Sequence, residues 1–241
     1  MKLFCIGCGP GDPDLLTIKA LNLIKEADVI FVPTSKSDKP SIALSIVAKY
    51  LNKTTKIINL IFPMIKDKNA LKEYWKKNTC EISEMVRTGK KTLYLTVGDP
   101  SLYSTWIYIH RELKKNHKDI EIEIVPGITS IFAFAAESKI SLVEGDEHLS
   151  VVPACYDLNK VKNTVRSSDT IAFLKDGRYF DSVIDMLSET GFSDESQIAI
   201  AQDVSTKENI LEIKHLKDIK GKKQPSQKYF SIMVVKRNDR E

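Results

Sequence analysis

Two glycine-rich segments follow apolar stretches of this chain, and their residue types suit backbone contact with a small ligand. The first is residues 7–13 (GCGPGDP), and the second is Gly98, Asp99 and Pro100. Glycine lets the backbone pass close to a bound molecule, and the N–H groups that open a following helix attract anionic or electron-rich atoms. A third segment, residues 125–130 (VPGITS), has the same character. Each alone could be an ordinary turn and helix cap, but together they indicate a ligand cleft at strand ends of an α/β sheet.

These segments do not match the familiar nucleotide-binding patterns. The dinucleotide fingerprint needs a third glycine where this chain has Asp12, whose carboxylate would repel a pyrophosphate. The phosphate-binding loop of nucleotide hydrolases also fails, because Glu84 stands in place of its first glycine and Lys91 in place of its Ser or Thr. The sequence therefore argues against an NAD or FAD enzyme and against a nucleotide hydrolase.

Nucleophilic, redox and metal chemistry have little local support. The four histidines are scattered without metal-ligand spacing, and no nucleophile elbow is present. Cys5 and Cys8 form a C-x-x-C pair, but no second pair supplies zinc ligands, so we interpret both as small buried hydrophobes. We predict no metal site and assign no catalytic base. Asp12 and Tyr103 are the plausible proton acceptors in the loops, with helix capping as the alternative role of Asp12.

The composition is that of a globular protein with a real core. The chain has 241 residues, of which 42% are hydrophobic and 28% charged, with a formal net charge of +4. Because Lys alternates with Glu and Asp, no nucleic-acid surface is indicated, whereas a mildly basic surface suits an acidic small molecule. No apolar run is long enough to span a membrane, and no leader pattern is visible. We expect no membrane partner and a cytoplasmic location.

The first half alternates short apolar segments with helical patterns. Strands that are apolar on both faces and separated by helices predict a parallel sheet covered on both sides. We expect strands at residues 3–6, 29–32, 56–60, 92–97 and 121–125, and helices at 15–25, 41–51, 70–88 and 105–115.

The second half predicts a mixed sheet, because its last strands follow one another without a long helix. We place the domain boundary between residues 115 and 127, assigning residues 1–120 to an N-terminal and 121–241 to a C-terminal α/β domain. The expected helices are 130–138 and 179–190, and the expected strands are 150–153, 170–174, 197–201, 210–214 and 229–235.

The loop segments resemble, in order and separation, the signatures of the tetrapyrrole methylase family, whose methyl donor is S-adenosylmethionine. The first signature is like residues 7–13 with residues 15–20 (LLTIKA), the second like Gly98 to Tyr103, and the third like residues 126–130. Any one of them would be weak evidence, but the three together are specific and span essentially the whole chain.

Several stretches look most like the branch of this family that methylates C-20 of precorrin-2 or cobalt-factor II in cobalamin synthesis. Another tetrapyrrole C-methyltransferase, or an RNA or diphthine methylase of the same fold, is the alternative within enzymes. A non-catalytic tetrapyrrole carrier or donor sensor is the alternative from another class. The stretches that carry the likeness are residues 31–36 (FVPTSK), 41–46 (SIALSI), 99–105 (DPSLYST), 144–147 (EGDE) and 229–232 (YFSI).

The resemblance implies two α/β/α domains, a parallel sheet in the first and a mixed sheet in the second, with the donor in a cleft between them, and a homodimer. Lys175 stands where many relatives carry a methionine against the donor. The residues matched to the donor site are Pro10, Gly98, Asp99, Pro100, Tyr103, Ser104, Thr129, Ser130, Lys175 and Ala201.

The implied substrate is a tetrapyrrole rich in carboxylates, so basic residues at the mouth of the site should matter. We assign substrate contacts to Asp12, Lys36 and Arg178. An electron-rich tetrapyrrole carbon needs no strong base, so catalysis would rest on alignment of the reacting atoms. Because charge is seldom needed for packing in a strand-end loop, we expect Asp99→Ala to weaken donor binding and leave the fold intact.

Overall fold

The computed structural model describes residues 1–36, 40–153, 157–174, 180–222 and 231–237. The chain forms two compact units, Met1–Thr129 and Ser130–Glu241. The boundary lies later than the position expected after residue 120. The reason is that β5 (Glu121–Val125) pairs in parallel with β1 (Lys2–Gly7), so this strand completes the first sheet.

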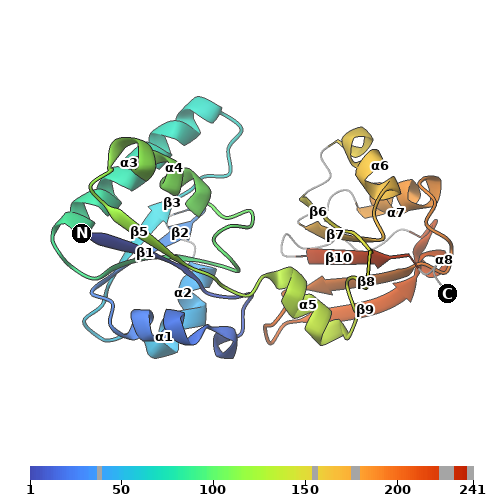
Figure 1. Ribbon diagram of the computed structural model, residues 1–241, viewed down its shortest axis with the longest axis horizontal. Helices are drawn as coiled ribbons and strands as arrows, with labels where there is room; N and C mark the ends of the chain where they lie inside the picture. The colour runs from blue at the N-terminus through green and yellow to red at the C-terminus, as the bar shows by residue number, and fades with distance from the viewer. Residues whose placement is uncertain (37–39, 154–156, 175–179, 223–230, 238–241) are drawn as a thin grey trace. The chain divides into compact units, whose positions relative to one another are not determined.

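The first unit contains the predicted parallel sheet, with its five strands in the order β3-β2-β4-β1-β5 (Figure 1). Besides β1 and β5, the strands are β2 (Val29–Thr34), β3 (Lys56–Ile61) and β4 (Thr92–Thr96). All five residues of β4 are buried, as expected for a strand covered on both faces. The helices are α1 (Ile18–Lys25), α2 (Ile42–Val47), α3 (Lys68–Arg87) and α4 (Trp106–Asn116), with short 3₁₀ turns at Pro13–Leu15 and Ala48–Tyr50.

Two apolar clusters cover the two faces of this sheet. Ile82 of α3 and Trp106 of α4 pack in one cluster, and Ile24 of α1 and Ile46 of α2 pack in the other. The first helix begins later than the pattern suggested, since the hydroxyl of Thr17 accepts a hydrogen bond from the Ala20 N–H at 3.2 Å and caps α1.

The second unit contains a five-stranded mixed sheet, in the order β6-β7-β10-β8-β9. The pair β6 and β7 is parallel, whereas β10 runs antiparallel to β7 and β8, and β9 antiparallel to β8. This confirms the predicted mixed sheet. The strands are β6 (Leu149–Pro153), β7 (Thr170–Leu174), β8 (Gln197–Gln202), β9 (Ile210–His215) and β10 (Ser231–Lys236), and the helices are α5 (Ser130–Ser138), α6 (Leu158–Arg166), α7 (Phe180–Glu189) and α8 (Leu216–Ile219).

The helix α6 is not among the helices predicted from the sequence. Its apolar residues are few, but Leu158, Val161 and Val165 follow helical spacing, and all three pack on the core of the second unit. The carboxylate of Asp157 caps its first turn by accepting from the Lys160 N–H at 3.4 Å. A helix rich in Lys and Asn is stabilised by this tertiary packing more than by its own propensity.

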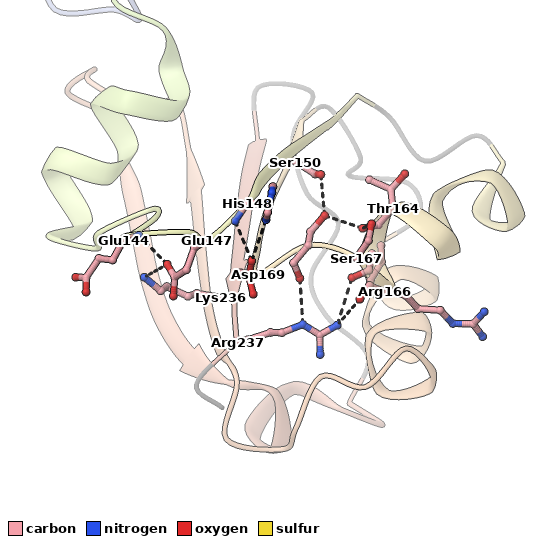
Figure 2. A network of polar contacts seen from close by, with 12 residues as sticks. Glu144, Glu147, His148, Ser150, Thr164, Arg166, Ser167, Asp169, Lys236 and Arg237 are labelled. Carbon is pink, nitrogen blue, oxygen red and sulfur yellow. Dashed lines mark hydrogen bonds and ion pairs between the residues drawn. The ribbon is translucent and has the colours of Figure 1, made fainter. Parts of the chain in front are cut away.

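Arg237, directly after β10, connects the ends of α6 and α7. Figure 2 shows its guanidinium directed at the end of α6, while the side chain of Arg166 points away. The guanidinium also lies 4.1 Å from the ring centroid of Phe192. It donates to the carbonyl oxygens of Ser168 (3.0 Å), Gly191 (2.6 Å), Val165 (3.3 Å), Thr190 (3.3 Å) and Arg166 (3.4 Å).

We expect Arg237→Lys to lower the free energy of unfolding by about 2 kcal/mol, because an ammonium cannot serve carbonyls in so many directions or stack on a ring. Chemical denaturation followed by circular dichroism measures the change. Arg166→Lys is the control and should shift stability by less than about 0.5 kcal/mol. Equal denaturation midpoints for the wild type and Arg237→Lys would contradict the stabilising role of the Arg237 guanidinium.

Within the described ranges, no helix combines the length and the hydropathy that crossing a membrane requires.

Candidate functional site

Three loops leave the same edge of the first sheet and are bonded to one another. The strands β4, β1 and β5 are adjacent and parallel, so the loops after them emerge side by side. Gly9 and Gly98 form an antiparallel bridge, in which Gly98 N–H donates to the Gly9 carbonyl at 2.7 Å and Gly9 N–H to the Gly98 carbonyl at 3.3 Å. The Cys8 N–H donates to the Thr96 carbonyl at 2.9 Å. The first unit therefore presents one joined loop cluster at the carboxyl ends of its strands.

Close backbone packing explains two of the glycines. A β-carbon on Gly7 would lie 2.5 Å from the nitrogen of Gly127 and 2.8 Å from the carbonyl oxygen of Gly98. A β-carbon on Gly127 would collide with that same oxygen and lie 2.7 Å from the carbonyl carbon of Gly7. Side chains at these positions would push the three loops apart, because the obstructing atoms are backbone.

Gly98 has a different role. Its φ is +68°, and a β-carbon there would meet no heavy atom within 4 Å. The surface of this glycine is therefore open, in a left-handed conformation that other residues adopt at a cost. A ligand can therefore approach the backbone closely at this position of the loop cluster.

The carboxylate of Asp99 ties the second loop to the third. One oxygen accepts from the Gly127 N–H at 2.9 Å, and the other accepts from the N–H and the hydroxyl of Ser101 at 2.8 and 2.5 Å. Burial tends to raise the pKa of Asp99, but these hydrogen bonds outweigh it and the pKa is lowered. Asp99 is thus an ionised residue with structural bonds, and we now expect its removal to weaken the fold as well as donor binding.

Tyr103 and Ser104 complete the turn into α4. Tyr103 has a φ of 50°, a conformation unusual for a bulky residue, and its side chain is 42% exposed. Burial raises the pKa of Tyr103, so its phenol is not a general base at neutral pH. The buried Ser104 hydroxyl lies 2.8 Å from the hydroxyl of Thr96 and accepts from the Trp106 N–H at 3.1 Å. The Ser104 hydroxyl therefore positions the loop and pairs the first N–H group of α4.

The other predicted residues of the first unit are spread along the same edge. Pro10 and Pro100 are buried in their loops. The carboxylate of Asp12 accepts from the Asp14 N–H at 2.8 Å and caps the 3₁₀ turn, which supports the capping alternative. Lys36 is exposed just after β2, a strand parallel to β4.

The remaining predicted residues divide between the units. Thr129 ends the first unit and is half-buried, while Ser130 begins α5. Ala201 is buried in β8 of the second unit. Lys175 and Arg178 lie outside the described residues.

Cys5 and Cys8 are both fully buried, which confirms their interpretation as small hydrophobes. Burial raises the pKa of the Cys5 thiol strongly and that of the Cys8 thiol to about 12. Neither thiol is ionised at neutral pH, so neither is an activated nucleophile. Over the described parts of the chain, no three His, Cys, Asp or Glu side chains converge as a metal site would require.

Thr96 and Ser101 belong to the bonded loops but are not among the site residues predicted from the sequence. Ser101 follows Asp99 by two residues, and an Asp followed by Pro and Ser is a recognisable signal for a side-chain turn. The contact between Thr96 and Ser104 spans a loop and has no comparably clear local signal.

The arrangement can hold a polar cofactor through backbone groups. It combines the open left-handed Gly98, the ionised carboxylate of Asp99 and strand-end carbonyls. Among the described residues of these loops we find no buried acid–base pair. Such a site suits a cationic or zwitterionic molecule whose own reactivity drives the chemistry. The loop cluster of the first unit fits S-adenosylmethionine, whose sulfonium carries the positive charge.

Comparisons with known proteins bear on this site. A sequence model of the Tetrapyrrole (Corrin/Porphyrin) Methylases matches residues 2–220. A probable cobalt-precorrin-2 C(20)-methyltransferase of Methanocaldococcus jannaschii is 44% identical over 174 residues, covering 72% of each chain. The cobalt-precorrin-2 C(20)-methyltransferase of Salmonella typhimurium is 30% identical over 190 residues, covering 79% of each chain.

A solved structure shows the same fold. Uroporphyrin-III C-methyl transferase from Thermus thermophilus, complexed with S-adenyl homocysteine, matches with a TM-score of 0.68 and 18% identity. The match covers 98% of this chain and 97% of that one. With the family's sequence pattern running through all three bonded loops, this chain belongs to the tetrapyrrole (corrin/porphyrin) methylases.

Proposed function

We propose that this protein transfers a methyl group from S-adenosylmethionine to C-20 of cobalt-factor II or precorrin-2 in cobalamin biosynthesis. The observation that carries the proposal is the 44% identity to a probable cobalt-precorrin-2 C(20)-methyltransferase. The second relative, at 30% identity, carries the same activity in its name. Both are named for the cobalt form, which favours the cobalt-containing substrate.

The donor of this family is S-adenosylmethionine, which supplies an electrophilic methyl group on a sulfonium. The open backbone at Gly98 would approach the donor, and the ionised Asp99 would keep Gly127 and Ser101 in place around it. The negative charge of Asp99 and the partial negative charges of the strand-end carbonyls would stabilise the positive sulfonium. The site would not need to ionise a nucleophile.

The chain's own contribution to the chemistry is then alignment. The macrocycle carbon is electron-rich, so holding it about 3–3.5 Å from the methyl carbon in a straight line supplies most of the acceleration. The substrate carboxylates would meet basic residues, for which Lys36 and Arg178 remain our candidates. Asp12 also remains a proposed substrate contact. Tyr103, Thr129, Ser130, Lys175 and Ala201 remain proposed donor contacts.

We also propose that the protein is a cytoplasmic homodimer. The free thiols of Cys5, Cys8 and Cys80 suit a reducing compartment. The dimer follows from the family resemblance alone. Light scattering coupled to size-exclusion chromatography measures the assembly, and a monomeric mass across micromolar concentrations would contradict it.

The decisive experiment is anaerobic incubation of the purified protein with S-adenosylmethionine and either precorrin-2 or cobalt-factor II, followed by mass spectrometry. We expect one added methyl group, faster with the cobalt compound, and NMR of the product should place it at C-20. A methyl group at another ring position would overturn the assignment to C-20 but would still identify the protein as a tetrapyrrole methyltransferase. Donor binding without methylation of either macrocycle would overturn the proposal.

A further inference from the structure

The second unit contains a strained segment directly after β8. Asp203 and Ser205 have φ values of 52° and 59°, which are unusual for residues other than glycine. Two non-glycine residues in the left-handed region within three positions carry a conformational cost, and such a cost persists only where surrounding contacts impose it. Specific contacts must therefore hold the backbone of residues 203–206 in this conformation.

Part of the constraint is local. The Thr206 N–H and hydroxyl donate to the Asp203 carbonyl at 3.1 and 2.7 Å, and the Asn209 N–H donates to the Thr206 carbonyl at 3.2 Å. Val204 between them is buried. These bonds fold the segment on itself, but they do not connect it to the rest of the unit.

Glu137, in the last turn of α5, makes that connection. One carboxylate oxygen accepts from the Ser205 hydroxyl at 2.5 Å, and the other accepts from the Asn209 side-chain amide at 2.5 Å. These partners lie 68 and 72 residues further along the chain. The single carboxylate therefore ties Ser205, within the strained segment, and Asn209, three residues after it, to α5.

The position of Glu137 does not suit the helix that carries it. A negative charge near a helix C-terminus is unfavourable, because the carbonyl end of the helix carries partial negative charge. Glu137 is also exposed and adds no apolar packing. Its two hydrogen bonds to the segment after β8 are thus what its carboxylate contributes to the structure.

We infer that Glu137 is a positioning residue, which holds residues 203–206 so that the end of β8 and the segment after it can contact the methyl donor. The inference rests on the proposed function, because Ala201 at the end of β8 is a donor contact only under that proposal. Glu137 itself need not touch the donor. Its effect passes through Ser205 and Asn209.

The test compares Glu137→Ala and Glu137→Gln with Glu208→Gln. Glu208 lies two residues after the strained segment and is exposed, and among the described contacts only its backbone N–H makes a hydrogen bond, so its replacement removes a charge without breaking the contacts of Glu137. The binding of S-adenosylmethionine is measured by calorimetry, and KM for donor and macrocycle and kcat are measured separately, with thermal unfolding as the fold control.

For Glu137→Ala we expect about a tenfold rise in the Kd and KM for the donor, as loss of charged hydrogen bonds predicts. The KM for the macrocycle and kcat should stay within about twofold, because alignment of a bound donor is unchanged. Glu137→Gln should lie between the wild type and Glu137→Ala, since its amide oxygen can accept one of the two bonds. Glu208→Gln should bind as the wild type.

A double-mutant cycle with Asn209→Ala separates positioning from general destabilisation. If Glu137 acts through Asn209, the two losses in donor affinity are not additive. Donor binding by Glu137→Ala equal to that of the wild type, or fully additive losses, would overturn the inference alone. A wild-type protein that binds no donor would overturn the proposed function and the inference with it.

Discussion

Gly127→Ala should abolish donor binding and lower the stability of the protein. The new β-carbon would collide with the Gly98 carbonyl oxygen and press on the backbone of Gly7. Because none of these atoms is the end of a flexible side chain, the loops after β1, β4 and β5 must separate. We expect a loss of about 3 kcal/mol in unfolding free energy, at the upper end of overpacking costs. Methyl transfer should fall at least about 100-fold, since misplacement by an ångström costs this much.

Gly89→Ala is the matched control for this substitution. Gly89 follows α3 with a φ of +77°, and a β-carbon there would meet nothing within 4 Å. Gly89→Ala should lower the free energy of unfolding by about 1 kcal/mol, because alanine is strained in the left-handed conformation, and should leave donor binding unchanged. Denaturation midpoints and calorimetry with S-adenosylhomocysteine measure both quantities. Equal donor affinities for Gly127→Ala and the wild type would show that the close packing of the loops does not shape the donor site.

Asp99→Asn should weaken both the loop cluster and the donor site while keeping the shape of the side chain. The carboxylate now accepts hydrogen bonds from the N–H groups of Gly127 and Ser101. The NH₂ group of an asparagine would face one of these two donors and could not accept from it. We expect a loss of about 2 kcal/mol in unfolding free energy and about tenfold in donor affinity, as for hydrogen bonds to a charged group. Asp14→Asn is the control, because Asp14 is an exposed acid paired with Lys49 and should change stability by less than about 1 kcal/mol.

The pH dependence of the Asp99 effect has a definite sign. The pKa of Asp99 is lowered in the folded protein, so its carboxylate contributes stability above the unfolded pKa of about 4 and loses that contribution as the pH falls through the folded value. The stability difference between the wild type and Asp99→Asn should therefore be constant from pH 5 to pH 7 and shrink below about pH 4. Urea denaturation across this range measures it. A difference that grows on acidification would mean that Asp99 is protonated in the native state.

Much of the fold follows from local sequence. The successive residues Leu93, Tyr94 and Leu95 of β4 place largely apolar side chains on both faces of the strand, which indicates a strand covered on both faces and predicts the parallel sheet. The second half of the chain has weaker local signals. The helix α6 carries only three apolar residues in its contact with the core, and its few local signals are too weak to distinguish from a loop.

The sequence by itself determined the alternation of strands and helices, the loops after the strands and the family, because apolar periodicity, capping residues and glycine motifs act over a few neighbours. The tertiary structure decided what the loop residues do. Gly7 and Gly127 are glycines because the order β4-β1-β5 brings three backbones together, and Asp99 is bonded across that junction. Glu137 meets Ser205 only when α5 packs beside the end of β8. Such contacts join residues far apart in the chain, so their energies depend on the strand order and on no local pattern.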